Sequence, residues 1–288
     1  MDFSVAIVGA GKVGFALARA WHQAGVNIRT VYSRTLADAQ SLASKVDARA
    51  VERLDELEGD LIVLCVPDGQ IQTVAAELQG RSSVQIVHTS GANGADLFVP
   101  YFKPEQVGSF HPAFPFTTPT DEIVSLAGVS FAVEAEDVVL QQRLNVLVDS
   151  LNGRVLHINL GKKPLYHAAL ALVSNYSVVL YATAERILKT VGADQQASDA
   201  VLNGLLAGTL QNLEQVGVPE ALTGPLVRQD LGTVQAHIDA LSQFDAGIAS
   251  AYLELVQLAL PVLSARGIPV EPVRTLIERE GEDASHSA

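Results

Sequence analysis

The sequence predicts an α/β fold, in which a doubly wound, mostly parallel sheet is followed by an all-helical second domain. Short apolar runs alternate with helical patterns over residues 1–160, as in strand–helix–strand units. A glycine-rich turn joins the first strand to the first helix. Beyond Gly161 only helical patterns remain. For 288 residues, two domains are also expected from length alone, and we place them at 1–160 and 161–288.

The first element is a short apolar strand that enters a glycine turn and then an amphipathic helix, which ends near Gly25. In such a turn Gly9 permits the tight bend, Gly11 lets a pyrophosphate approach the backbone, and Gly14 lets the helix pack on the sheet. The phosphates would lie on the free N–H groups at the positive end of the helix. The strand before the turn and the helix after it disfavour a ligand-free turn. The predicted cofactor contacts are Gly9, Ala10, Gly11, Lys12, Val13 and Gly14.

The end of the second strand, Asn27 to Tyr32, indicates which dinucleotide binds. A carboxylate near this point holds the ribose hydroxyls of NAD, whereas an arginine accommodates the 2′-phosphate of NADP. Here Ser33, Arg34 and Thr35 follow the strand, and no acidic residue occurs before Asp38. We therefore expect NADP, held in part by these three residues. The same residues could simply begin the next helix, and the two interpretations are compatible.

The following strands are predicted at residues 60–67, 84–88, 107–112, 129–133 and 154–158, with a helix over about 137–151 between the last two. Asp68 is expected to cap a helix that runs to about Leu78. Ligands of doubly wound sheets bind outside the carboxyl ends of the strands. Val66, Pro67 and Ser90 follow such ends, so we expect them to line one crevice with the glycine turn.

The second domain opens with a locally unfavourable residue. Helices are predicted at residues 164–191, 195–215, 231–244 and 247–265, before a polar, frayed tail at 278–288. Pro164 suits the first helical position, so Lys163 would be the cap, where a cation is disfavoured. Such a choice often indicates a functional site. The polar residues of this helix form a stripe, with Asn175 at its flank: Lys163, His167, Ser174, Ser177 and Tyr181. A solvated lysine and a buried, hydrogen-bonded histidine are the alternative.

A second polar cluster lies between Thr223 and Asp230. Arg228 could bind a substrate carboxylate through two parallel hydrogen bonds, with Thr223 and Asp230 as further substrate contacts. Alternatively, Asp230 caps the helix that contains Thr233 and His237, and Arg228 pairs with it.

Composition excludes several classes of function. A net charge of −13 without a basic run argues against nucleic-acid binding. The single cysteine, Cys65, cannot form an internal disulfide. The histidines, including His88 and His237, show no short paired ligand spacing, so no metal is expected. Residues 164–184 lack charged side chains, but their polar residues favour a buried or dimer-interface helix over a membrane span. Without a signal peptide, a cytoplasmic protein is expected.

Taken together, the sequence resembles a known family over nearly its whole length. It is similar to the Rossmann-like reductases with a C-terminal helical domain of formerly unknown function. These are relatives of pyrroline-5-carboxylate reductase, ketopantoate reductase and the β-hydroxyacid dehydrogenases. The matching segments are Gly9 to Gly14, Val66-Pro67-Asp68, His88-Thr89-Ser90-Gly91, Ser109-Phe110-His111-Pro112, Lys163-x-x-Tyr166-His167 with Asn175, Thr223-Gly224-Pro225 and Arg228-x-Asp230.

The resemblance implies NADP-dependent reduction of a small carbonyl or imine compound, with the active site between the domains, and some members of the family are thought to reduce ketopantoate. In related dehydrogenases a lysine on the first helix of the second domain assists proton transfer, and an asparagine follows four residues later. Here His167 follows Lys163 at that distance and Asn175 comes later, which leaves the proton donor and the substrate open.

We expect hydride transfer from NADPH to a small 2-oxo acid or related carbonyl compound, with ketopantoate as one candidate. Lys163, with His167 as a candidate relay, would polarise the carbonyl and protonate the alkoxide. His111, Asn175 and Arg228 would orient the substrate, and Ser90 would contact it. A cyclic imine reductase and a non-catalytic NADP sensor are the alternatives. The apolar helices at residues 164–184 and 247–263 suggest a homodimer through the helical domain.

Overall fold

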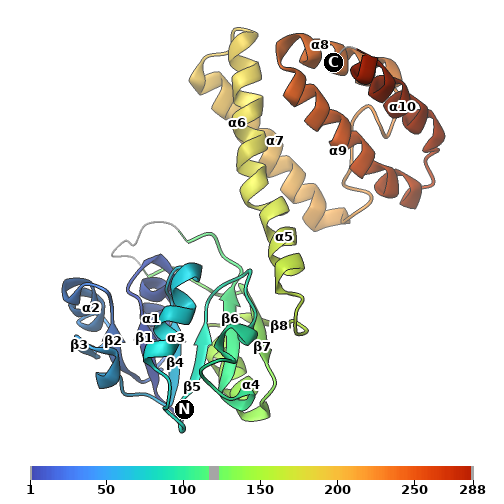
Figure 1. The fold of residues 1–288 in the computed structure, drawn as a ribbon. Helices are drawn as coiled ribbons and strands as arrows, with labels where there is room; N and C mark the ends of the chain where they lie inside the picture. The colour runs from blue at the N-terminus through green and yellow to red at the C-terminus, as the bar shows by residue number, and fades with distance from the viewer. Residues whose placement is uncertain (1, 117–122, 287–288) are drawn as a thin grey trace. The chain divides into compact units, whose positions relative to one another are not determined.

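The computed structural model describes residues 2–116 and 123–286. The chain divides into two compact units, Met1–Leu180 and Tyr181–Ala288 (Figure 1). The expected domain boundary at residues 160–161 lies between the last strand and the helix that begins at Lys163. The division between the compact units falls within a later helix, Asn175–Thr190.

The first unit contains one mostly parallel sheet. Its described strands are β1 (Val5–Val8), β2 (Ile28–Tyr32), β3 (Arg49–Val51), β4 (Leu61–Leu64), β5 (Gln85–His88), β6 (Val107–Pro112), β7 (Ser130–Ala135) and β8 (Arg154–His157). Their order is β3-β2-β1-β4-β5-β6-β7-β8, and β6 with β7 is the antiparallel pair. The doubly wound sheet is therefore confirmed. Strand β3 was not predicted, because three residues are too short for a readable pattern.

Both faces of the sheet are covered. On one face α1 (Lys12–Gln23), α2 (Leu36–Ala43) and α4 (Val138–Ser150) pack in a core that includes Trp21 and Phe110. On the other face lie α3 (Ile71–Glu77) and 3-10 turns, in a core around Phe98. The strand residues alternate between these two cores: Val5 and Ile7 face the first, and Ala6 and Val8 the second. This alternation explains why β1 is apolar throughout.

The long helix predicted over residues 164–191 is interrupted. It forms α5 (Lys163–Val173) and α6 (Asn175–Thr190), with Ser174 between them. Helix α5 begins at Lys163, so the prediction that Lys163 is the cap was wrong by one residue, and Lys162 takes that position. Pro164 is tolerated one position later because N–H groups throughout the first turn lack an intrahelical partner. Apart from Lys163, no residue of the two helices is buried within the chain, so of the two expected arrangements the buried helix is not found and the dimer-interface helix stays a prediction.

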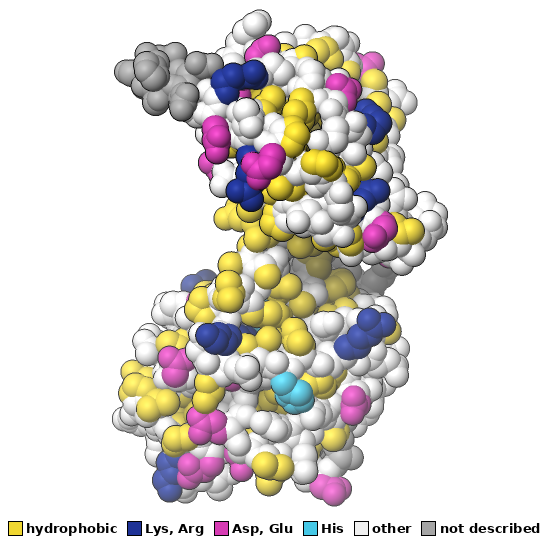
Figure 2. Space-filling model, turned by 90° about the vertical axis from the view of Figure 1, so that its right-hand side faces the viewer, with side chains coloured by type: hydrophobic (Ala, Val, Ile, Leu, Met, Phe, Trp, Pro, Cys, Tyr) yellow, Lys and Arg dark blue, Asp and Glu magenta, His cyan; other side chains and the backbone are white. Residues whose placement is uncertain are grey.

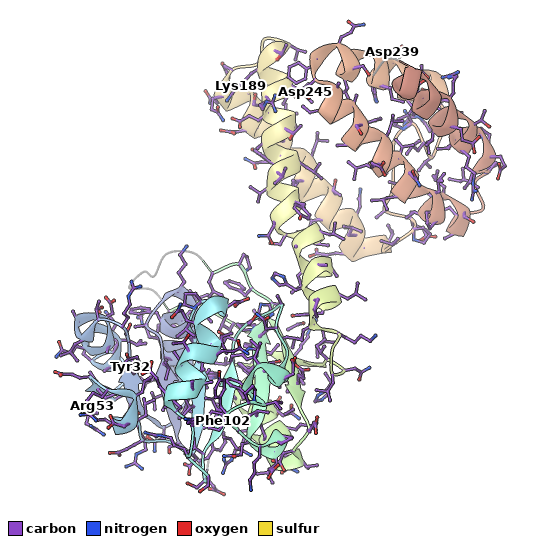
Figure 3. All side chains as sticks on the ribbon, in the orientation of Figure 1. Tyr32, Arg53, Phe102, Lys189, Asp239 and Asp245 are labelled. Carbon is purple, nitrogen blue, oxygen red and sulfur yellow. The ribbon has the colours of Figure 1, made fainter. Side chains whose placement is uncertain are left out.

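The second unit is helical. It contains α7 (Gln195–Val216), α8 (Leu231–Phe244), α9 (Ala246–Ala265) and α10 (Glu271–His286). Val234 of α8, Val256 of α9 and Val273 of α10 meet in its core. Helix α10 includes much of the tail expected to be frayed, because Val273 and Leu276 anchor it to α8 and α9. In Figure 3, Asp245 marks the start of α9, where its carboxylate accepts hydrogen bonds from the backbone N–H groups of Gly247 and Ile248.

Two helical stretches are long and apolar enough to cross a membrane by length and composition alone, Lys163–Thr190 and Ala246–Ala265. This is weak support for a membrane span, because core helices of other proteins meet the same criterion.

Candidate active site

Two positions of the glycine turn have no room for a side chain. Gly9 has φ +105°, and a Cβ atom there would lie 2.3 Å from the backbone oxygen of Cys65. A Cβ atom at Gly14 would lie 2.0 Å from the backbone oxygen of Gly9. At Gly11, by contrast, a Cβ atom would meet nothing within 4 Å. The first two glycines therefore hold β1, β4 and α1 close together, while the third faces open space.

Helix α1 presents free donors to this open space. Gly11 is its cap residue and, lacking a side chain, leaves the N–H groups of the first turn without a capping partner. The helix dipole adds partial positive charge at the same place, and the first turn contains no acidic residue. The turn therefore has the steric and electrostatic properties of an anion site.

The segments that were expected to line one crevice follow strands that end side by side. Val8 is in register with Tyr32 and with Leu64, and Leu64 is in register with His88. Figure 3 shows Tyr32 at the carboxyl end of β2. The loops that carry Ser33, Pro67 and Ser90 consequently leave from the same edge of the sheet as the glycine turn.

The residues after β2 remain available to a ligand. Arg34 is exposed, and among the described residues it forms no hydrogen bond or ion pair. Thr35 is the cap residue of α2, and its hydroxyl donates a hydrogen bond to Asp38. Asp38 is thus engaged within its own helix turn.

Ser90 belongs to a small polar network. Its hydroxyl donates to the carboxylate of Asp68 at 2.9 Å and accepts from the backbone and side-chain N–H groups of Asn93 at 3.1 and 3.0 Å. The Asn93 amide also donates to Asp68 at 3.0 Å. The prediction that Asp68 caps a helix was wrong: Pro67 holds the cap position of a 3-10 turn, and Asp68 accepts from Ser90 and Asn93 instead. Because the Ser90 hydroxyl donates its hydrogen bond to Asp68, it ties the loop after β5 to the turn after β4.

Lys163 is the buried centre of the site. Its side chain is fully buried at the start of α5, and Nζ has no hydrogen-bond partner among the described residues. Nζ lies 5.6 Å from the centre of the Tyr166 ring. Burial lowers the pKa of Lys163 to about 8, while the charges of Glu134 and Asp68 act in the opposite direction. The alternative of a solvated lysine is therefore wrong.

His111 and Tyr166 stand beside this lysine. His111 Nδ1 lies 3.0 Å from the Tyr166 hydroxyl. Burial and the Lys163 charge lower the pKa of His111 to about 3, and burial raises that of Tyr166 to about 12. Both side chains are therefore neutral at physiological pH.

Gly91 brings three elements into contact at this point. A Cβ atom on Gly91 would lie 2.6 Å from Cδ2 of His167 and 2.8 Å from Nε2 of His111. The loop after β5, strand β6 and helix α5 therefore approach one another as closely as a glycine allows. His167 itself is exposed, which contradicts the alternative of a buried histidine there.

His88 is buried, and both of its ring nitrogens are used by the fold. Nε2 lies 2.9 Å from the Gly94 backbone oxygen, and Nδ1 accepts from the Ser90 N–H at 3.2 Å. Burial lowers the pKa of His88 to about 4. Among the described residues no group of His, Cys, Asp and Glu side chains could hold a metal ion.

Glu134 is a site residue that the sequence patterns did not reveal. It is 2% exposed on β7, and its carboxylate accepts hydrogen bonds from the Ala95 N–H at 3.0 Å and the Ser109 hydroxyl at 3.1 Å. The strand was predicted to end at Val133, one residue before Glu134, whereas β7 continues to Ala135. Burial raises the pKa of Glu134. A polar residue inside a strand that continues apolar would have been the available signal.

The remaining predicted residues lie elsewhere in the chain. Asn175 is exposed at the first position of α6. Thr223, Arg228 and Asp230 belong to the second unit and are exposed. Asp230 caps α8, accepting from the Thr233 N–H at 3.1 Å and its hydroxyl at 2.7 Å. The capping interpretation of Asp230 is thus confirmed, and the substrate contacts of these three residues stay predictions.

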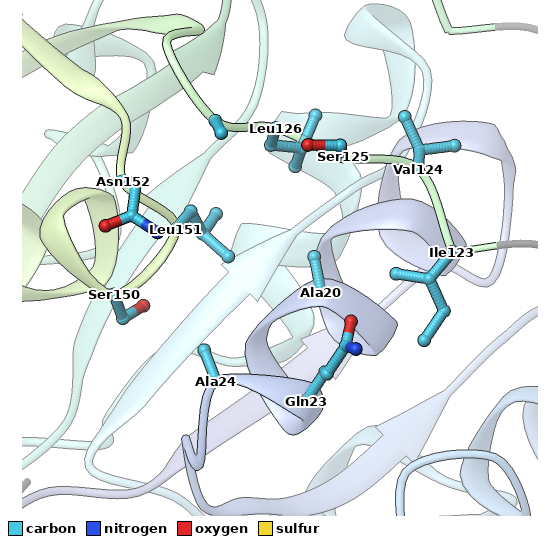
Figure 4. A pocket seen from close by; sticks show the side chains of 11 residues that line it. Ala20, Gln23, Ala24, Ile123, Val124, Ser125, Leu126, Ser150, Leu151 and Asn152 are labelled. Atoms are coloured by element: carbon cyan, nitrogen blue, oxygen red, sulfur yellow. The ribbon is translucent and has the colours of Figure 1, made fainter.

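A pocket elsewhere in the first unit lacks the chemistry of an active site (Figure 4). It is lined by the end of α1, residues 123–127 and the residues from Ser150 to Asn152. None of its lining side chains is titratable. It also lies where α1 and α4 end, and helices that follow parallel strands end near the opposite edge of the sheet from the glycine turn.

Two family models match parts of the chain. One family model, a Rossmann-like domain, matches residues 1–108, and another, a domain of unknown function (DUF2520), matches residues 129–280. No curated protein matches the chain.

Solved structures resemble the chain over most of its length. A Thermotoga maritima protein is 24% identical, covers 91% of this chain and 99% of its own, and has a TM-score of 0.75. A pyrroline carboxylate reductase from Plasmodium falciparum with NADP bound is 13% identical, covers 87% and 95%, and has a TM-score of 0.59. An imine reductase from Bacillus cereus is 18% identical, covers 98% and 94%, and has a TM-score of 0.52. At these identities the similarity shows the fold.

Proposed function

The chain belongs to the family defined by the domain of unknown function DUF2520, and we propose that it is an NADP-dependent reductase of a small 2-oxo acid. The observation that carries this proposal is the buried amine of Lys163. It lies beside His111 and Tyr166, and within the described part of the chain it has no hydrogen-bond partner. A buried, unpartnered cation is costly unless a ligand uses it. The carbonyl oxygen of a 2-oxo acid is such a ligand.

The glycine turn and Arg34 fit NADP. The open space at Gly11 and the uncapped start of α1 suit a pyrophosphate. Arg34 has no partner among the described residues and could bind the 2′-phosphate. The P. falciparum relative holds NADP, which supports the same choice here. When bound, the cofactor supplies the hydride, and the ratio of kcat/KM with NADPH and NADH measures this preference.

The side chains around Lys163 can provide the proton and the orientation. With a pKa of about 8, Lys163 is mostly protonated at neutral pH and can polarise a carbonyl and then protonate the alkoxide. If the Tyr166 hydroxyl donates to Nδ1 of His111, neutral His111 carries its proton on Nε2 and can donate it to the substrate. His167, one turn after Lys163, is positioned as a relay to solvent.

The test is NADPH oxidation across a panel of 2-oxo acids that includes ketopantoate. We expect turnover with at least one of them, and a loss of about 100-fold or more in kcat for Lys163→Ala, the range for general acid catalysis. Lys162→Ala is the matched control, because Lys162 is the exposed neighbour of Lys163. A Lys163→Ala enzyme within a few-fold of the wild type would remove this role from Lys163.

Reduction of a cyclic imine is the second candidate, favoured by the structural similarity to pyrroline carboxylate and imine reductases. An iminium substrate is already positive, so a protonated lysine beside it would be repulsive. Rates on 2-oxo acids and on cyclic imines, measured side by side, distinguish the two. A protein that binds NADPH but oxidises it with neither class would instead be an NADP sensor.

A further inference from the structure

A row of polar side chains crosses the sheet at its carboxyl edge. His88 on β5 is in register with Ser109 on β6, and Ser109 is in register with Glu134 on β7. Neighbours in register point to the same face of a sheet. All three residues are buried, at 0%, 0% and 2% exposure. The row continues the apolar row formed by Val8 and Leu64 on the neighbouring strands.

Glu134 is the anionic member of this row and is held rigidly. Its carboxylate accepts from the Ala95 N–H and from the Ser109 hydroxyl, which fixes its position from two neighbouring elements. Burial raises the pKa of Glu134, and the charge of Asp96 acts in the same direction, while the two hydrogen bonds and the charge of Lys163 act to lower it. Gly94 leaves room for the carboxylate, since a Cβ atom there would lie 3.2 Å from Oε1 of Glu134.

Few of the other described groups that act on Lys163 are negatively charged. His88 and His111 are neutral, and Tyr166 is a neutral phenol. Asp68 is exposed and already accepts hydrogen bonds from Ser90 and Asn93. His111 lies two residues after Ser109 on β6, so it faces the same side of the sheet as this row, and its Nδ1 lies 3.0 Å from the hydroxyl of Tyr166 on α5. The first turn of α5, which carries Lys163, therefore packs beside the row in which Glu134 is the buried carboxylate. The charge of Glu134 accordingly acts to raise the pKa of Lys163, against the effect of burial.

We propose that Glu134 is a positioning residue that holds the Lys163 amine in its protonated, proton-donating form. The buried and doubly hydrogen-bonded carboxylate supplies a fixed negative charge at the sheet edge, and the amine of α5 remains free of a direct partner so that it can contact the substrate. The inference rests on the proposed function only for its catalytic consequence, because the charge coupling between the two residues is independent of any substrate.

The chain provides a matched pair of variants. Glu134→Gln removes the charge while keeping a group that can accept both hydrogen bonds. Glu136→Gln removes the same charge two residues along the chain. Glu136 and Glu134 line one pocket together with Leu160 and Gly161, but Glu136 is exposed. The titration of Lys163 is followed by NMR in protein with 13Cε-labelled lysine, and its signal is assigned by its loss in Lys163→Arg.

We expect Glu134→Gln to lower the measured pKa of Lys163 by about 1 unit or more, the usual effect of removing a nearby opposite charge. Glu136→Gln should shift it by much less. The alkaline limb of kcat/KM should move to lower pH by the same amount in Glu134→Gln, with Km for NADPH unchanged. Glu134→Asp, which keeps the charge but moves it, should fall between the wild type and Glu134→Gln.

An equal pKa of Lys163 in the wild type, Glu134→Gln and Glu134→Asp would overturn the inference, whether or not the protein turns over substrate. If Glu134→Gln fails to fold, the Glu134→Asp titration decides in its place. A protein that shows the pKa shift but no NADPH oxidation on any substrate would contradict the proposed function and leave the charge coupling intact. The two proposals therefore fail through different observations.

Discussion

The burial of the Lys163 amine also makes the stability of the fold depend on pH. An amine whose pKa falls from 10.5 in the unfolded chain to about 8 in the folded one binds its proton more weakly after folding. Below pH 8 both states are protonated, and the full cost of burying the ammonium is present. Between pH 8 and 10.5 the unfolded state binds more protons, so folding stability rises with pH as this cost is relieved.

The first prediction follows from this rise of folding stability with pH. The free energy of unfolding of the wild type, minus that of Lys163→Met, should be flat below pH 7.5 and should rise between pH 8 and 10. Its slope is at most about 1.4 kcal/mol per pH unit. Urea unfolding of the two proteins at a series of pH values measures it. A difference that stays constant up to pH 10 would show that Lys163 keeps its ordinary pKa.

For single residues, the sequence patterns identified Lys163 but not the side chains that surround it. Lys163 was found because a cation is unfavourable at the start of a helix, which is a local property. Glu134 and Asp68 act on it from β7 and from the turn after β4. Neither is near Lys163 along the chain, so no spacing rule could have connected them. The Ser90 hydroxyl was predicted as a ligand contact, which stays a prediction, and its hydrogen bond to Asp68 is a contact that the sequence did not indicate.

Among the elements, the glycine turn contains one glycine that packing requires and another that faces open space, where a ligand is expected. A Cβ atom at Gly14 would lie 2.0 Å from the Gly9 backbone oxygen and 3.0 Å from Cβ of Cys65, whereas the space at Gly11 is open. Gly11 also has φ −75° and ψ −172°, an extended conformation that alanine adopts without strain. One glycine should therefore matter for the fold and the other for the ligand.

We accordingly predict that alanine at Gly14 affects stability, whereas alanine at Gly11 affects NADPH binding. Gly14→Ala should destabilise the protein by about 1–3 kcal/mol, the usual cost of overpacking. Gly11→Ala should leave Tm nearly unchanged but weaken NADPH binding by about 10-fold or more, about 1.4 kcal/mol, because its methyl group occupies the space meant for phosphate. Thermal unfolding and NADPH fluorescence titration measure the two effects. Tight NADPH binding by Gly11→Ala would place the cofactor elsewhere.

Elements with a strong local pattern were predicted within a few residues. Strand β6 and helix α8 are where their patterns place them, at Val107–Pro112 and Leu231–Phe244. The break at Ser174 and the helical state of α10 were missed. Helix α10 is stabilised by apolar contacts with α8 and α9, which no local pattern contains.

At the scale of the whole molecule, apolar side chains remain uncovered. Figure 2 shows large hydrophobic areas on one face of the chain. On α7, Leu205 is 65% exposed and Leu210 is 58% exposed, and Val178 on α6 is 69% exposed. Such an extent of exposed apolar surface is unusual for a monomer. We propose that a second copy of the chain covers it, as the apolar helices suggested.

Sedimentation velocity tests this proposal. The wild type should sediment as a dimer, and the double variant Leu205→Glu with Leu210→Glu should sediment as a monomer, because buried charges without partners oppose association. Gln196→Glu is the control, since it adds a charge at an exposed polar position of the same helix. A monomeric wild type at micromolar concentration would refute the homodimer.

Local sequence patterns predicted the sheet and the glycine turn and singled out Lys163 as a candidate, because each of these signals depends on residues that are close together in the chain. Hydrophobic periodicity, glycine spacing and helix-end preferences are all local signals. Only the tertiary structure decided which groups surround the lysine. The register of β5, β6 and β7 aligns His88, Ser109 and Glu134, and α5 places the Lys163 amine where the charge of Glu134 acts on it. Strand register depends on pairing across the whole sheet, so the electrostatics of the site are a property of the fold.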